Sequence, residues 1–437
     1  MRRFLFSSGH FPGYVDWGGL LETACVLQDR GHEVRWVSAD SISSLLRRVK
    51  IQFSSVPVAI GSSRSRRSHT APQHENGCKQ ARAVGQMIDL WMDEEQVAEA
   101  CDAHLKIIAD WSPDVVIADP TVLAAALAAE AAATPLAGCG YPGATFVIPG
   151  EPRMMNVVDE FFARLNRLRS RLGLRAAPPR PDPDFLFIAP SLHLVYTTPQ
   201  WFEQFLLALE PLASEGDGTL LSQKPRISPG AAYVGGRAMA PRTPAPEWLD
   251  DLPTDRPVVL IGRSTNYQPM AESMRIAFQI IKGANAFGLI GGSPALRSAL
   301  EPLPSYIRWE PWLPYEHVMP RVDAIIHHGG FGTTCLAVQH AVPQVVVPEI
   351  SDNYGHAQSV ARSGAALAFG SSTATGPLLT SALRDVLEKP HYRNAAIELQ
   401  AQFASLGGAP TAAELLLALA EERALRQTPV EVATLVD

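Results

Sequence analysis

Short apolar runs alternate with helical patterns at the start of the chain. Residues 4–6 are a short apolar run, residues 20–30 have the periodicity of a helix that ends at Gly31, and residues 33–37 form the next apolar run. Glycine is common just past a helix end because it adopts the left-handed backbone conformation there. The pattern therefore predicts a strand–helix–strand unit, and such units build parallel sheets with helices on their faces.

The same rhythm continues in two series. In the first, residues 114–118 predict a buried strand, 120–133 a helix and 134–138 another strand, whereas 150–215 look helical apart from a Pro-rich interruption. In the second series, residues 270–285 predict a helix. Apolar runs that predict strands lie at residues 257–262, 287–290, 307–309, 324–326 and 344–347. Two such series predict an α/β fold with two Rossmann-like, doubly wound domains.

The length and a change of composition place the domain boundaries. A chain of 437 residues is too long for one ordinary core and suits two domains. Between the two series the chain is rich in Pro and Gly and poor in pattern, apart from a predicted strand over residues 232–235. We therefore predict an N-terminal domain over residues 1–215, a linker over 216–256, a C-terminal domain over 257–410, and a helix and tail over 411–437.

Composition narrows the class of protein. Hydrophobic residues make up 46% and charged residues 19% of the chain, which is typical of a globular protein. The net charge of -7 disfavours a nucleic-acid partner, because phosphate backbones are bound by clustered Lys and Arg. The 5 cysteines lack metal-ligand spacing and fit a reducing compartment, and no apolar run is long enough to span a bilayer. We expect a cytoplasmic protein with no signal peptide, membrane span or metal site; its oligomeric state stays open.

A glycine-rich turn carries the strongest functional signal. An apolar run leads into His327 and His328, and glycines follow until a helix begins near Thr333. Backbone N–H groups at a helix start lack partners, and the helix dipole places about half a positive charge there, so that such an end binds phosphate. Gly330 and Gly332 let a diphosphate approach the backbone, while His328 and Thr333 can each donate a hydrogen bond. Taken alone, the pattern also fits an ordinary tight turn.

Two flanking segments strengthen the phosphate interpretation. Trp312 lies upstream of His328 and offers a flat ring on which a nucleobase can stack, although it also fits a core position. Asp352 and Asn353 follow a buried strand, and ligands of parallel sheets bind at the carboxyl ends of the strands. The same pair also fits a helix N-cap.

The segment from Trp309 to Ala368 resembles the signature of family-one nucleotide-sugar glycosyltransferases of the bacterial antibiotic and macrolide type. A weaker resemblance covers most of the chain. It implies the GT-B fold, in which two Rossmann-like domains face each other across a cleft and the C-terminal domain binds the donor. It also implies that a nucleoside diphosphate (NDP) sugar is the donor and a small aglycone is the acceptor, bound by the N-terminal domain.

The resemblance implies a donor site residue by residue. Trp312 stacks on the base, and the backbone of Leu313 pairs with it. The diphosphate lies against Gly262, Arg263, Ser264, His328, Gly330, Gly332 and Thr333. Arg263 is our own addition to that set and fits a surface position equally well. Asp352 and Asn353 bind donor sugar hydroxyls, and Asn353 is shorter than the Gln that the family usually has.

The catalytic base has two candidates. The family places a His in the first loop and supports it by an Asp after a later strand, and Asp119 matches that Asp. Counting back from His32 places Asp16, not a His, at the base position, and the nearest His is His10. Either Asp16 is the base, which the ungapped count favours, or a rearranged loop presents His10. If Asp16 lies beside Asp119, the pKa of one of the two carboxyls is raised.

We expect an inverting, metal-independent transfer of a hexose or deoxyhexose to an aglycone of secondary metabolism, with no cofactor beyond the NDP-sugar co-substrate. Candidates for the acceptor pocket, or for ordinary core, are the first loop, residues 61–80 and 145–165, Trp91 and Tyr141. Two alternatives stay open: an NDP-sugar epimerase or hydrolase of the same fold, and a non-catalytic partner protein that has lost the base. A nicotinamide dehydrogenase is disfavoured, because no Gly-x-Gly-x-x-Gly turn follows the first strand. The nucleotide, the sugar and the acceptor atom are not determined.

Overall fold

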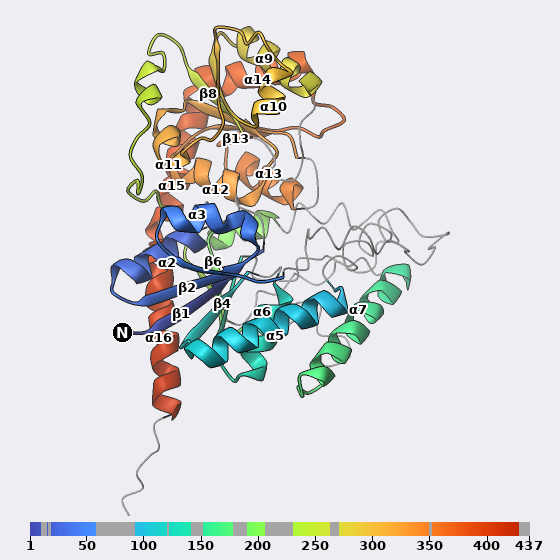
Figure 1. Ribbon diagram of the computed structural model, residues 1–437. Helices are drawn as coiled ribbons and strands as arrows, with labels where there is room; N and C mark the ends of the chain where they lie inside the picture. Colours follow the sequence, from blue (N-terminus) through green and yellow to red (C-terminus); the bar gives the residue numbers. More distant parts are fainter. Residues whose placement is uncertain are drawn as a thin grey trace, which may run out of the picture.

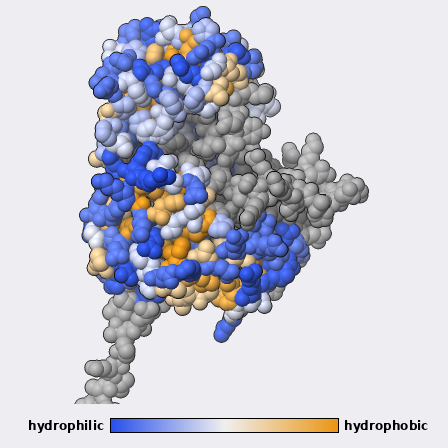
Figure 2. All heavy atoms as spheres, in the orientation of Figure 1, coloured by the Kyte–Doolittle hydropathy of each residue, from blue (hydrophilic) through white to orange (hydrophobic). Residues whose placement is uncertain are grey.

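The computed structural model describes residues 1–9, 15, 19–57, 92–119, 122–140, 152–177, 190–205, 230–262, 271–348 and 352–427. Within them the chain forms two parallel β-sheets, each covered by helices and each the centre of one domain, and the domains are stacked end to end (Figure 1). Figure 2 shows apolar surface chiefly on the first domain, while the visible face of the second is largely polar. The predicted α/β architecture with two doubly wound domains is confirmed.

In the described residues the first sheet has seven strands in the order β3-β2-β1-β4-β5-β6-β7, all parallel to their neighbours. The strands are β1 (Arg3–Ser7), β2 (Glu33–Ser38), β3 (Gln52–Ser55), β4 (Val115–Ala118), β5 (Leu136–Cys139), β6 (Leu192–Val195) and β7 (Ala231–Tyr233). The helices of this domain include α2 (Leu20–Asp29), α3 (Ser43–Arg48), α5 (Glu94–Trp111), α6 (Leu123–Ala131) and α7 (Pro152–Arg171). Central β1 is buried from both faces, which explains its continuous apolar run.

The second sheet has six strands in the described residues, in the order β10-β9-β8-β11-β12-β13, again all parallel. The strands are β8 (Val258–Ile261), β9 (Phe287–Gly291), β10 (Ile307–Glu310), β11 (Ala324–His327), β12 (Gln344–Val346) and β13 (Ala366–Ala368). The helices are α9 (Ala271–Gly283), α10 (Pro294–Ser298), α11 (Tyr315–Val318), α12 (Phe331–Gln339), α13 (Asn353–Arg362), α14 (Gly376–Glu388) and α15 (Pro390–Ser405). The strand order reverses between β8 and β11, and ligands of such sheets bind at that crevice.

One strand of the first sheet, β6, differs from the sequence-based picture, whereas β7 lies at the strand predicted within the linker. β6 interrupts the region 150–215 that the pattern presents as helical, so the prediction is wrong there. Its run of four residues is too short to be told from a buried helix by periodicity. β7 comes from the region expected as linker and pairs with β6 at the edge of the first sheet.

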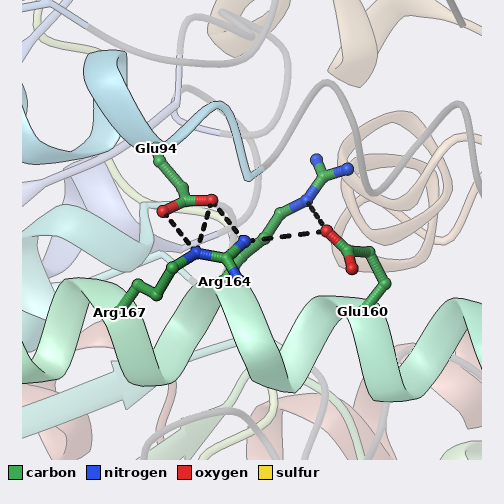
Figure 3. A network of polar contacts seen from close by, with 4 residues as sticks. All are labelled: Glu94, Glu160, Arg164 and Arg167. Atoms are coloured by element: carbon green, nitrogen blue, oxygen red, sulfur yellow. Dashed lines mark hydrogen bonds and ion pairs between the residues drawn. The ribbon is translucent and has the colours of Figure 1, made fainter.

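Helix α7 is fastened to α5 by an ion-pair network and by apolar packing. Figure 3 shows Arg167 of α7 clamping Glu94, with Nη2–Oε1 at 2.6 Å and Nε–Oε2 at 3.0 Å, while Arg164 pairs with Glu160 at 2.9 Å. Exposed pairs of this kind are worth about 0–1 kcal/mol each. Apolar side chains of α7 that are almost fully buried contribute more to its position: Phe161, Leu165 and Leu168.

The chain crosses between the domains twice, and the two crossings touch. The first passes through Gly235, where an added Cβ would meet the Phe403 carbonyl oxygen at 2.1 Å. The second passes through Gly408, which has a φ of 65° and donates its N–H to the Val234 carbonyl at 2.7 Å. Helix α16 (Ala409–Gln427) then runs back over the first domain and packs on α2 (Figure 1).

The stretch Pro390–Arg423 is long and apolar enough to cross a membrane when judged by length and composition. In the structure it consists of two helices, α15 and α16, which break at residues 406–408. Several of its apolar side chains are fully buried in the core that the two domains share: Phe403, Ala412, Ala413, Leu416 and Ala420. Packing within this shared core therefore accounts for part of the apolar character of this stretch, since 39% of its most apolar 18-residue window is buried.

Candidate active site

The glycine-rich turn joins β11 to α12 at the point where the order of the second sheet reverses. Gly329 has a φ of 82°, and an added Cβ there would meet the Asn353 carbonyl oxygen at 2.8 Å. Gly330 is the N-cap and offers no side chain to cap the helix. In the described part of the chain, the N–H groups of Gly332 and Thr333 make no hydrogen bond, and the first intrahelical bond is made by the Thr334 N–H. The start of α12 therefore presents N–H groups that are open to an anion.

The two adjacent histidines have different environments. His327 is almost fully buried; its Nδ1 accepts the Gly329 N–H at 3.1 Å, and its Nε2–H therefore donates to Gln344 Oε1 at 2.8 Å. Burial, together with the neighbouring His328, lowers the pKa of His327 to about 3. His327 thus links the glycine-rich turn to β12. Both of its ring nitrogens are already hydrogen-bonded, so neither can bind a ligand.

His328 folds back over the turn that it begins. An added Cβ on Gly330 would meet its Nε2 at 2.4 Å, so only glycine leaves the ring room there. Its Nδ1 is buried and has no hydrogen-bond partner among the described residues. Burial lowers the pKa of His328 to about 4, so the ring is neutral near pH 7 and has one N–H to donate. An unpaired buried nitrogen beside open N–H groups is suited to an oxyanion ligand.

Gly262 brings the end of β8 against the same turn. Its N–H donates to the Ile326 carbonyl at 2.8 Å, and an added Cβ would meet Thr333 Cγ2 at 3.3 Å. Thr333 is 5% exposed. The structure thus places Gly262 and Thr333 side by side, as the resemblance implies. Arg263 and Ser264 lie outside the described residues.

The acid–amide pair begins α13, next to the turn. Asp352 occupies the N-cap position of α13, as the alternative interpretation expects, but its side chain is 39% exposed and makes no capping hydrogen bond. Asn353 is 6% exposed, and its carbonyl faces Gly329. The pair and the glycine-rich turn therefore lie together at one edge of the sheet.

Trp312 lies after β10 at the same carboxyl edge, and its indole is 49% exposed, unlike the core residue Trp309 at 7%. The core interpretation of Trp312 is therefore wrong. Leu313 beside it is 3% exposed and packs into the second domain. The Arg48 guanidinium of α3 lies over the indole, 4.3 Å from Cζ to the ring centroid, a cation–π contact between the domains.

A hollow lies beside this contact, between α2 and α3 of the first domain and α11 and α12 of the second. It is lined by Arg48 and Trp312 and, in the C-terminal half of α12 and just after it, by Leu336, Gln339 and His340. The turn at His328 begins α12 at its other end and does not line the hollow. Sequence reasoning missed Arg48, because a single Arg on a short helix carries no signal of a partner far along the chain.

Asp119 follows β4 at the carboxyl edge of the first sheet. It is 3% exposed, and its Oδ2 accepts the Gly9 N–H at 3.2 Å while its own N–H donates to the Ser7 carbonyl at 3.0 Å. Asp119 thus fixes the chain directly before the first loop. His10 and Asp16, together with Trp91, Tyr141 and residues 61–80 of the expected acceptor pocket, lie outside the described residues.

Comparison with solved structures defines the class of protein. A glycotransferase of kitacinnamycin has a TM-score of 0.70 at 17% identity, and the match covers 96% of this chain and 99% of that chain. The glycosyltransferase VinC, solved in complex with dTDP, has a TM-score of 0.64 at 20% identity and covers 96% and 100%. The chain has the GT-B fold of glycosyltransferases.

Sequence comparisons then point to the family. The model of the erythromycin biosynthesis protein CIII-like C-terminal domain matches residues 293–421, which include the whole glycine-rich turn and Asp352–Asn353. The 4'-demethylrebeccamycin synthase of Lentzea aerocolonigenes is 24% identical over 438 residues, covering 93% of this chain and 97% of that protein. The chain is a glycosyltransferase enzyme, and these similarities support the resemblance to family-one glycosyltransferases of the antibiotic type.

Proposed function

We propose that this enzyme transfers a hexose or deoxyhexose from an NDP-sugar to a small natural-product aglycone. The observation that carries the proposal is the unpartnered Nδ1 of His328 beside the open N–H groups that begin α12. Both are donors for phosphate oxygens, and the similar GT-B enzyme VinC was solved with dTDP. Antibiotic-pathway relatives support a natural-product acceptor.

The donor lies along the carboxyl edge of the second sheet in this proposal. The diphosphate occupies the turn at His328, Gly330, Gly332 and Thr333, opposite Gly262, with Arg263 and Ser264 as further contacts. Trp312 stacks on the base beside the Leu313 backbone. The exposed carboxylate of Asp352 and the amide of Asn353 bind the donor sugar.

The proposed reaction is inverting. The acceptor atom attacks the anomeric carbon from the side opposite the nucleotide, the bond from that carbon to the diphosphate oxygen breaks, and the NDP leaves with the electron pair. The acceptor proton passes to a base in the first loop, either Asp16 or His10, supported by Asp119. A positioned base contributes about 10²–10⁴-fold to the rate.

Charge on the departing diphosphate is handled by the N-terminus of α12 and by His328, so the proposal includes neither a metal ion nor a further cofactor. We also place the enzyme in the cytoplasm, without a membrane span or a nucleic-acid partner. The packing of α15 and α16 and the net charge of -7 support these placements.

A thermal-shift panel with UDP, dTDP and GDP, followed by calorimetry, tests the donor proposal. Charge-assisted hydrogen bonds are worth about 1.5–3 kcal/mol, so His328→Ala and Thr333→Ala should each weaken the preferred nucleotide about tenfold. His391→Ala, on an exposed part of α15, is the matched control. If the double variant His328→Ala, Thr333→Ala binds as wild type does, the diphosphate site is elsewhere.

Activity as a function of pH in Asp16→Asn, His10→Ala and Asp119→Asn ranks the candidates for the base. The variant of the true base should lose its activity while retaining nucleotide binding. Full activity in all three would show that the first loop has been misinterpreted. Turnover of the sugar nucleotide without any acceptor would instead favour an epimerase or hydrolase.

A further inference from the structure

A buried histidine links the acid of the proposed sugar subsite to the first domain. His356 is 1% exposed and lies one turn after Asp352 on α13, with Nε2 3.8 Å from Asp352 Oδ2. Its ring is enclosed by Trp201 and Phe205 of the first domain and by Phe331, which begins α12, at centroid distances of 6.2, 4.9 and 5.3 Å. The His356 side chain thus lies against Asp352, against the residue that begins α12 and against the first domain.

The Trp201 indole determines which nitrogen of His356 carries the hydrogen. Its Nε1–H donates to His356 Nδ1 at 3.4 Å, and an indole nitrogen can only donate. In a neutral ring the hydrogen therefore sits on Nε2, which faces Asp352. Burial, together with His327, lowers the pKa of His356 to about 3, so the ring is neutral near pH 7. The contact with Asp352, at 3.8 Å between Nε2 and Oδ2, is longer than a hydrogen bond and brings an N–H dipole near a carboxylate rather than forming an ion pair.

The Trp201 segment is itself fixed to α13. The Ser359 hydroxyl lies 3.1 Å from the Trp201 carbonyl and 2.9 Å from the Gly355 carbonyl, so its single hydrogen is shared between the two acceptors. An added Cβ on Gly355 would meet the Phe205 ring at 2.4 Å, so glycine lets the helical residues 199–205 lie directly on α13. The indole is therefore held in place against the helix that begins with the acid–amide pair.

We propose that His356 is a positioning residue of the donor-sugar subsite, whose Nε2–H orients the Asp352 carboxylate while Trp201 of the first domain fixes the required tautomer. The inference rests on the proposed function, since it assigns Asp352 to the donor sugar. It predicts that recognition of the sugar depends on this contact between the domains and that recognition of the nucleotide does not.

Calorimetry with dTDP and dTDP-glucose, or with UDP and UDP-glucose if the panel selects UDP, tests the inference. His356→Leu should weaken the sugar nucleotide about tenfold while the free nucleotide changes less than about twofold. His356→Gln, whose amide can replace the Nε2–H, should recover the affinity to within about threefold of wild type. In kinetics, the KM for the sugar nucleotide should rise more than kcat falls.

A variant of Trp201 and a control on the same helix separate positioning from packing. Trp201→Phe keeps a ring but removes the N–H, so the ratio of the two affinities should shift in the same direction even if His356→Leu does not fold. Nitrogen-15 NMR should show the Nε2–H tautomer in the wild type and its loss in Trp201→Phe. Arg362→Ala removes only the bond to Gln204 at 2.7 Å and should leave the ratio unchanged.

Four outcomes would overturn the inference. Equal weakening of both ligands in His356→Leu would show a merely structural role. Loss of sugar-nucleotide affinity in Asp352→Ala without a loss in His356→Leu would remove the inference and leave the proposed function intact. Unchanged affinity in Asp352→Ala would remove the sugar role of Asp352 as well, and a wild type that binds neither nucleotide would remove the proposed function with it.

Discussion

The carboxyl edges of the two sheets share a backbone geometry but differ in their polar chemistry. At the first edge, the polar groups around Ser7 and Asp119 satisfy one another, although the Tyr233 hydroxyl at the end of β7 has no partner among the described residues. The Ser7 hydroxyl donates to His104 Nε2 at 2.9 Å, because His104 Nδ1–H already donates to the Ala100 carbonyl at 2.7 Å. The Gly9 N–H is bound by Asp119 at 3.2 Å.

At the second edge, the corresponding groups stay open. His328 Nδ1 and the N–H groups of Gly332 and Thr333 make no hydrogen bond within the described ranges. Both edges carry buried histidines with lowered pKa values, so residue type does not distinguish them. The unpaired His328 Nδ1 together with open N–H groups at a helix start distinguishes the proposed ligand site, because a buried polar group without a partner is costly unless a ligand completes it.

The largest expected effect comes from removing the imidazole of His328, whose Nδ1 has no partner. His328→Ala should lower kcat/KM about 100-fold, as the loss of one donor to a developing oxyanion does elsewhere, and should leave stability nearly unchanged. Steady-state kinetics and urea denaturation of the same samples measure both. A stable variant with wild-type kinetics would show that the open edge binds nothing of importance.

Acid should destabilise both edges alike. Burial lowers the pKa of several histidines to about 3 or 4: His104, His193, His327, His328, His340 and His356. Between the unfolded value of 6.5 and these folded values the unfolded chain binds more protons, so the free energy of unfolding falls as pH drops from about 6.5 to about 4. Urea midpoints across this range should show it, with a smaller slope in His104→Gln and in His328→Gln. A flat profile would contradict the assigned protonation states.

At the satisfied edge, Ser7→Ala should affect stability rather than catalysis. It leaves the buried His104 Nε2 without its partner, and an unsatisfied buried group costs about 1–3 kcal/mol. The urea midpoint should fall accordingly, while kcat/KM per folded molecule stays within about twofold. A selective loss of kcat would assign this pair a part in the reaction.

The smallest effect is expected for the contact between Arg48 of the first domain and the Trp312 indole of the second. Arg48→Ala frees the face of Trp312 that the guanidinium covers, and an exposed cation–π contact is worth about 0.5–1 kcal/mol. Nucleotide affinity should therefore rise about two- to fivefold in calorimetry, with Arg47→Ala as the neighbouring control. Weaker binding in Arg48→Ala would show instead that the guanidinium contacts the nucleotide.

Sequence patterns predicted the features whose signals are local. The apolar runs gave most strands, and the motifs from Trp312 to Asn353 gave a proposed donor site, of which the fold brings Thr333 next to Gly262 and Asn353 next to Gly329. The patterns did not show that His327 and His328 have different roles. That difference arises because His327 is hydrogen-bonded to Gln344 on a neighbouring strand. The contact of Arg48 with Trp312 and that of Trp201 with His356 join residues far apart in the chain, and no periodicity records them. The choice between His10 and Asp16 stays a prediction.

The touching crossings at Gly235 and Phe403 affect how this enzyme can be recombined with its relatives. A chimera cut once, in the middle of the chain, would exchange the first domain but keep a foreign α16 on its surface. The domains are not continuous in sequence, because the final helix, α16, packs on the N-terminal domain. Swaps of the first domain should therefore carry residues 409–427 along with the N-terminal half.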